Sequence, residues 1–72
     1  MIKTITGAYI AERTVERIYT AWDVDHVMLR IIVETRGGKQ RDCVAAVNTW
    51  DAVGGEAYIA RQLEKLVKEV DG

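Results

Sequence analysis

The most basic segment of this 72-residue sequence lies between residues 30 and 41. This segment has one acid, Glu34, and a local charge of +3 from four cations: Arg30, Arg36, Lys39 and Arg41. Guanidinium groups pair well with phosphate oxygens, and a glycine turn lets backbone N–H groups approach an anion closely. The segment therefore indicates nucleic-acid or phosphate binding through a basic β-hairpin. A solvated turn explains the same charge without a ligand, and the net charge of −1 is unlike that of a dedicated nucleic-acid binder.

A second cluster of polar groups surrounds the single histidine, in the run Trp22-Asp23-Val24-Asp25-His26. Two carboxylates and an imidazole are ligands that divalent metals accept. Three neighbouring donors without a distant fourth ligand do not make a site, and aspartate is common in turns. We therefore expect a turn here, and no metal.

The lone thiol, Cys43, is the only candidate nucleophile of its kind. Nucleophilic catalysis would require a base within hydrogen-bond reach, and His26 is the single histidine available. The sequence contains no nucleophile elbow, phosphate loop, dinucleotide fingerprint or zinc-protease motif. We expect a protein without enzymatic activity, catalytic residues or cofactor.

Large aromatic side chains are few, because the sequence contains two tryptophans, three tyrosines and no phenylalanine. A small core buries some of them, but tryptophan and tyrosine also dominate binding hot spots. Trp22 stands beside a predicted turn, and Trp50 lies in a segment that connects two predicted elements. The residues predicted to bind a partner are Trp22, Asp23, Trp50 and Tyr19.

The clearest element is a helix over about residues 55–70. Its apolar residues recur at spacings of three and four and draw one stripe: Ile59, Ala60, Leu63, Leu66, Val67 and Val70. Glu64 and Lys68 form a favourable i, i+4 pair on another face. This stripe is wide enough to suggest a contact beyond the sheet that the helix covers.

A β-hairpin is predicted over about residues 27–47. The first strand is rich in β-branched residues that alternate with polar ones, and the returning strand begins near Lys39. Gly37-Gly38 between them predicts a two-residue turn, since glycine adopts positive φ without strain.

Residues 10–22 fit either of two structures. Their apolar positions match one face of a helix, whereas Ile18, Thr20, Trp22 and Val24 alternate as a strand does. We favour the strand, preceded by a short strand over residues 2–6. The predicted fold is α+β: an antiparallel sheet of three to four strands with a C-terminal helix packed on it. The alternative arrangement is βαββα.

Length and composition predict a single domain over residues 1–72. The chain is 49% apolar and 29% charged, which suits a small folded domain. No stretch approaches the roughly 18 apolar residues of a membrane span, and no export signal is recognised. One cysteine permits no internal disulfide, so we expect a cytoplasmic protein. Because so small a core is marginal, a homodimer is a further expectation.

These features favour a small non-catalytic protein that binds a macromolecular partner, as an adaptor or an inhibitor does. In size and general character the chain resembles the small α+β proteins encoded by bacteria and their phages, anti-CRISPR inhibitors among them. That resemblance implies a protein partner, and no residue is assigned from it.

Overall fold

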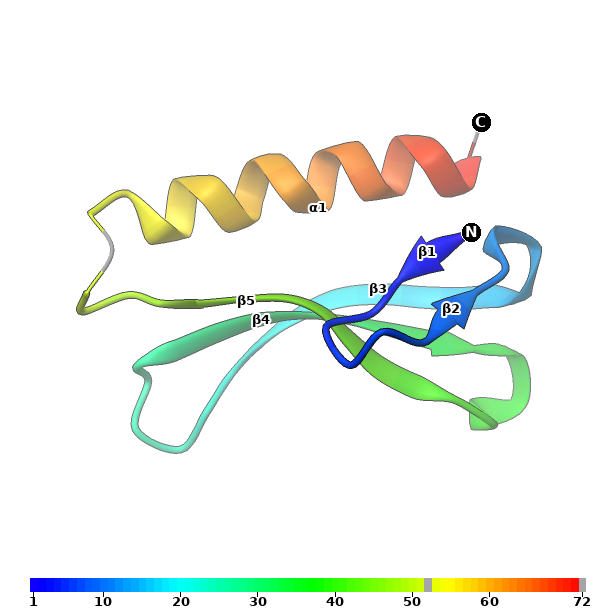
Figure 1. Ribbon diagram of the computed structural model, residues 1–72, viewed down its shortest axis with the longest axis horizontal. Helices are drawn as coiled ribbons and strands as arrows, with labels where there is room; N and C mark the ends of the chain where they lie inside the picture. Colours follow the sequence, from blue (N-terminus) through cyan, green and yellow to red (C-terminus); the bar gives the residue numbers. More distant parts are fainter. Residues whose placement is uncertain (52, 72) are drawn as a thin grey trace.

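The computed structural model describes residues 1–51 and 53–71. It contains a three-stranded antiparallel sheet in the order β3-β4-β5, a separate two-stranded antiparallel pair, and one helix that lies across a face of the larger sheet (Figure 1). The elements are β1 (Ile2–Lys3), β2 (Tyr9–Ile10), β3 (Val15–Trp22), β4 (Met28–Thr35), β5 (Arg41–Asn48) and α1 (Gly55–Asp71). The predicted α+β fold with a C-terminal helix on an antiparallel sheet is confirmed.

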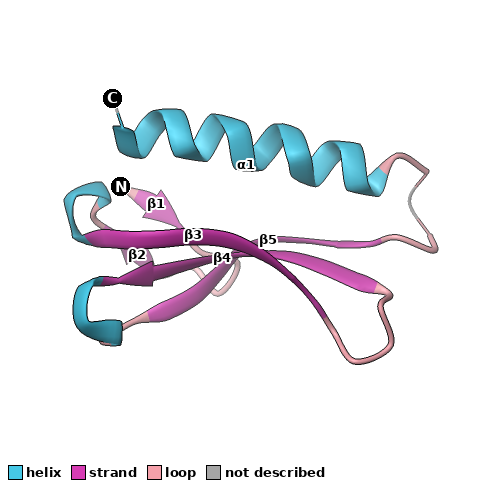
Figure 2. Ribbon diagram, turned by 180° about the vertical axis from the view of Figure 1, so that it is seen from behind, coloured by secondary structure: helices cyan, strands magenta, loops and turns pink. Residues whose placement is uncertain are grey.

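The core lies between α1 and the central strand β4 (Figure 2). Burial alternates along all eight residues of β4, with the odd-numbered side chains buried and the even-numbered ones half-buried. Ile31 and Val33 have no exposed surface, and Ile59 and Leu66 of α1 lie in the same cluster. The remaining buried hydrophobic residues are Ile2, Ile10 and Leu29. The alternating burial of β4 is typical of a strand that is covered on one face, and it fixes the register in which β4 pairs with its neighbours.

Within residues 10–22, Val15–Trp22 form the strand β3, which follows a 3₁₀ turn at Glu12–Thr14 and the end of β2 at Ile10. Its partner in the sheet is β4, with Ile18 opposite Val33 and Trp22 opposite Leu29. The favoured strand is therefore confirmed, and the βαββα alternative is wrong. Pairing to a buried central strand outweighs the helical spacing of the apolar residues in this segment.

Three boundaries differ from the predicted ones, and in the first of them the returning strand β5 begins at Arg41 instead of near Lys39. The hairpin turn is longer than two residues: Gly37 and Gly38 both have positive φ, of 73° and 66°, and the turn closes where the Thr35 N–H donates to the Gln40 carbonyl at 2.9 Å. The first strand, expected over residues 2–6, comprises only Ile2–Lys3, because Thr4 already bonds to Ala8 across a tight turn.

The two edges of the larger sheet differ. Beside β5, the N–H of Ile5 donates to the carbonyl of Cys43 at 3.0 Å, so the N-terminal segment covers part of that edge. At the other edge, β3 has a strand neighbour on one side only. Among the described residues, no helix is both long and apolar enough to cross a membrane.

Candidate functional site

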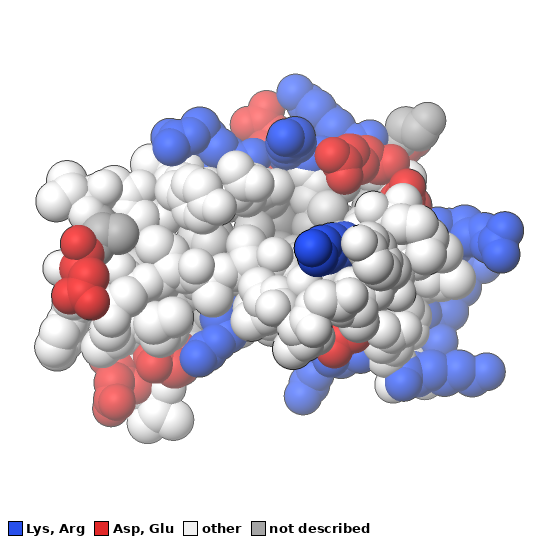
Figure 3. Space-filling view, viewed as in Figure 1, with Lys and Arg blue, Asp and Glu red and all other residues white. Residues whose placement is uncertain are grey.

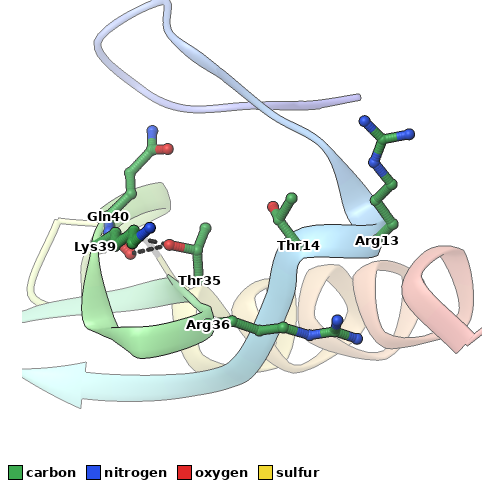
Figure 4. Close-up of a pocket in the computed structure, with 6 residues that line it drawn as sticks. All are labelled: Arg13, Thr14, Thr35, Arg36, Lys39 and Gln40. Carbon is green, nitrogen blue, oxygen red and sulfur yellow. Dashed lines mark hydrogen bonds between the residues drawn. The ribbon is translucent and has the colours of Figure 1, made fainter.

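The hairpin turn and the start of β3 together form a hollow of about 650 Å³. We call it the basic hollow, and its lining residues are Arg13, Thr14, Thr35, Arg36, Lys39 and Gln40. Figure 4 shows Lys39 and Gln40 on one side of Thr35 and Thr14 and Arg13 on the other, with Arg36 extending from below Thr35. The lining therefore includes three cations and no carboxylate.

The sheet register brings these residues together. Val15 lies opposite Thr35 in the β3–β4 ladder, so the residues before Val15 lie beside those after Thr35. Thr35 then holds the turn, because its buried hydroxyl accepts the Gln40 N–H at 3.0 Å. Arg13 lines the hollow only because β3 pairs with β4 in this register. The sequence predicted the strands but not their register, so it did not identify Arg13 as a site residue.

The four cations predicted for a phosphate site separate into two groups. Arg36 and Lys39 line the basic hollow. Arg41 lies opposite Glu34 in β5, and Arg30 lies opposite Ala21 and Ala46 in the middle of the sheet, so neither belongs to the lining.

At the opposite end of the sheet, two loops are tied together. The N–H and hydroxyl of Thr49 both donate to the carbonyl of Val27, at 2.9 and 2.8 Å. This bond joins the β3–β4 turn to the segment that leads into α1, and Asn48 Oδ1 accepts the N–H groups of Trp50 and Asp51 in the same segment. Internal hydrogen bonds thus hold the β3–β4 turn and residues 48–51 of the following segment.

Large apolar side chains are exposed at this end of the molecule, which we call the loop end. Its members are Trp22, Val24, Trp50, Val53 and Tyr58, five of the nine large hydrophobic residues exposed in the described chain. Trp50 is 79% exposed, and Val24 and Val53 are essentially uncovered. A hollow of about 540 Å³ lies beside Val53 and Tyr58. The sequence predicted both tryptophans as partner-binding residues. It gave no indication that Val24 and Val53 are exposed, because no local pattern distinguishes an exposed valine from a buried one.

The predicted partner-binding residues are not all at one place. Trp22, Asp23 and Trp50 all lie in or beside the loops of the loop end, and the Trp22 ring lies 5.7 Å from the His26 ring between centroids. Tyr19 lies opposite Ile32 on the sheet face away from the buried side chains, where its hydroxyl donates to Glu34 Oε2 at 3.3 Å. Arg17 stacks over the Tyr19 ring at 4.8 Å, so Tyr19 belongs to a separate surface.

Asp23 has a structural task in the turn. Its Oδ1 accepts the N–H groups of Val27 and Met28 at 2.9 and 3.2 Å. The Val27 hydrogen bond, aided by that from Met28 and by the nearby charge of Arg30, holds the pKa of the Asp23 carboxyl below its ordinary value. Since this carboxylate already bonds to the backbone, its role as a turn former is the simpler interpretation.

Cys43 and His26 are well separated along the sheet. Cys43 lies opposite Ile32 of β4. Met28 lies four residues before Ile32 in the same strand, a length of about 13 Å, and His26 comes before Met28. The Cys43 thiol donates to the Ala45 carbonyl at 3.2 Å. The structure therefore does not bring the thiol and imidazole together.

Charge is distributed unevenly along the molecule, whose longest axis is 34 Å (Figure 3). The basic hollow lies at one end of this axis. The loop end has four acids, Asp23, Asp25, Asp51 and Glu56, and the runs 22–28 and 49–56 contain neither lysine nor arginine. Arg61 also lines the hollow beside Val53 and Tyr58, and Arg30 acts on Asp23, so the loop end is free of cations only within these two runs.

Comparison of the chain with protein-family models, with curated proteins and with solved structures finds no match in any of the three. The site must therefore be interpreted from its own chemistry.

Proposed function

We propose that this protein is a non-catalytic binding protein that docks on a protein partner through its loop end. The observation that carries the proposal is the concentration of exposed Trp22, Val24, Trp50, Val53 and Tyr58 at one end of the molecule. Contiguous exposed apolar surface is typical of protein-interaction sites, and tryptophan and tyrosine commonly supply most of the affinity.

The chemistry of the loop end specifies the partner surface. Its apolar side chains require an apolar pocket, and its four acids require lysine or arginine around that pocket. Two loops held by hydrogen bonds at Thr49 and Asn48 support the proposal, because an ordered surface loses less conformational entropy on binding. The partner surface is thus apolar at its centre and basic at its rim.

An adaptor or an inhibitor would act in this way, by occupying a surface of a larger assembly without chemistry of its own. The free thiol of Cys43 is compatible with a reducing compartment such as the cytoplasm, where we place the protein.

The test is affinity capture from an extract of the source cells with immobilised wild type and two matched variants. Trp50→Ala removes an exposed ring at the loop end, and Tyr9→Ala removes a 56% exposed ring from β2. We expect Trp50→Ala to lower the affinity for the captured protein roughly 30-fold or more, the loss typical of a hot-spot residue. Tyr9→Ala should leave it unchanged.

The captured protein must also respond to charge. Asp25→Asn and Asp51→Asn together should weaken its binding, and added salt should reduce the difference between this double variant and wild type. Capture that survives Trp50→Ala, or that Tyr9→Ala abolishes to the same degree, would contradict docking through the loop end.

A further inference from the structure

The basic hollow lies at the end of the molecule remote from the loop end and has no part in the function proposed above. Its three cations come from two segments that are distant in sequence, the 3₁₀ turn before β3 and the hairpin turn after β4. Since Arg13, Arg36 and Lys39 line one hollow, their like charges add to a local positive potential there. A folded chain that concentrates cations without a compensating acid is prepared for an anionic ligand.

The polar neighbours of these cations already have partners within the protein. The Thr14 hydroxyl donates to the Ala11 carbonyl at 2.7 Å, and the Thr35 hydroxyl bonds to the backbone of Gln40. The Gln40 amide donates to Asp42 Oδ2 at 2.7 Å. These residues shape the hollow, so the groups available to a ligand are the cationic ends.

Within the described part of the chain, three carboxylates lie near the hollow: Asp42 accepts from the Gln40 amide, and the other two pair with groups outside the lining. Glu12, beside Arg13, pairs with the N-terminal ammonium group, and this ion pair lowers the pKa of its carboxyl. Glu34, beside Thr35, lies 3.9 Å from the Arg17 guanidinium and accepts from Tyr19. The ion pairs found within the described ranges 1–51 and 53–71 include none of the three cations of the hollow.

We propose that the basic hollow binds phosphate groups, held by Arg13, Arg36 and Lys39. Two guanidinium groups and an ammonium group match the charge and the several acceptor oxygens of phosphate better than those of a single carboxylate. The charged ends point to different sides of the hollow and not to one point (Figure 4), an arrangement that can hold successive phosphates of a nucleic-acid strand. A small phosphorylated molecule is the other source of the same group.

The acids at the loop end do not oppose this binding at ordinary salt. The screening length is about 8 Å at physiological ionic strength, whereas the molecule is 34 Å long. A ligand at the hollow therefore responds to the local cations and not to the net charge of −1.

The test uses fluorescence anisotropy with a labelled short oligothymidylate. Three phosphate contacts predict a slope of about −2 for the logarithm of affinity against that of salt concentration, or about 20-fold weaker binding at 200 mM than at 50 mM salt. The triple variant Arg13→Gln, Arg36→Gln, Lys39→Gln should abolish binding. Arg13→Gln alone should weaken it roughly 1.5- to 5-fold, the range for a single exposed charge pair.

A second triple variant controls for charge alone. Arg61→Gln, Lys65→Gln, Lys68→Gln removes the same number of charges from the exposed surface of α1 and should leave affinity and salt slope unchanged.

The second arm of the test is a titration with inorganic phosphate, monitored by the amide NMR shifts around Arg36 and Lys39. Shifts with inorganic phosphate but no affinity for oligothymidylate support the site and assign it to a small phosphorylated ligand. Failure of both probes, or equal losses in the two triple variants, would overturn the proposal.

Discussion

The burial of Ile59 allows a quantitative test of how α1 docks on the sheet. This side chain is 1% exposed and lies in the cluster with Ile31 and Val33. Ile59→Ala removes buried methyl groups and leaves a cavity, at a cost of about 2–5 kcal/mol. The better helix propensity of alanine returns only roughly 0.4 kcal/mol.

That loss is large relative to the whole stability of the domain. At about 0.05–0.15 kcal/mol per residue, 72 residues give a free energy of unfolding of about 4–11 kcal/mol. A loss of about 3 kcal/mol would lower the melting temperature by about 12–24 °C, and the urea midpoint by about 1–3 M. Val67, 38% exposed on the same helix, supplies the control, since Val67→Ala should change stability by no more than about 0.5 kcal/mol.

The assay is urea unfolding followed by far-ultraviolet circular dichroism, with wild type and both variants measured at one protein concentration. Equal urea midpoints for Ile59→Ala and Val67→Ala would contradict the docking of α1 on the sheet through Ile59. In that case the apolar residues of α1 that include Ile59 would not close the hydrophobic core against the sheet.

Three further predictions concern the turns and the edge of the sheet. The pKa of Asp23 is lowered in the folded protein, so its negative charge stabilises the fold at any pH above the pKa of the unfolded chain, which is about 4. This stabilisation is lost as the pH falls through the pKa of the folded protein. The difference in urea midpoint between wild type and Asp23→Asn should therefore shrink on acidification, and a constant difference would contradict it. Gly37→Ala should destabilise the protein by about 1 kcal/mol, because φ is +73° there, and unchanged thermal unfolding would show that the turn is formed differently. Replacing both Glu16 and Arg17 by Thr removes exposed charge from the edge strand β3, where charged side chains oppose edge-to-edge pairing with another chain. Light scattering should therefore detect a higher dimer fraction for the variant than for wild type. Equal molar masses of the two proteins at all concentrations would show that these charges do not prevent pairing.

The sequence was sufficient to predict those elements whose pattern is local. The stripe from Ile59 to Val70 and the alternation from Val27 to Thr35 each reflect one covered face, so α1 and β4 were predicted nearly residue by residue. The segment before Trp22 satisfied two periods at once, and only pairing to β4 decides between them.

The candidate sites were less predictable, because they depend on residues that are distant in sequence. The cations Arg36 and Lys39 were evident from their spacing, whereas Arg13 joins them only through the Val15–Thr35 register. Exposure of Trp50 could be suspected from its place between two elements. The exposure of Val53 depends on how the connection folds back toward α1, which no local pattern encodes.

The acids of the loop end and the cations of the basic hollow lie toward opposite ends of a 34 Å molecule and contribute an electric dipole along it, which Arg61 at the loop end and Asp42 near the hollow partly offset. A dipole aligns in an external field before any contact is made, so the protein approaches a polyanion with the hairpin turn foremost and a cationic surface with the loop end foremost. At low ionic strength the same protein should be retained on both anion- and cation-exchange media at a single pH, although its net charge is only −1.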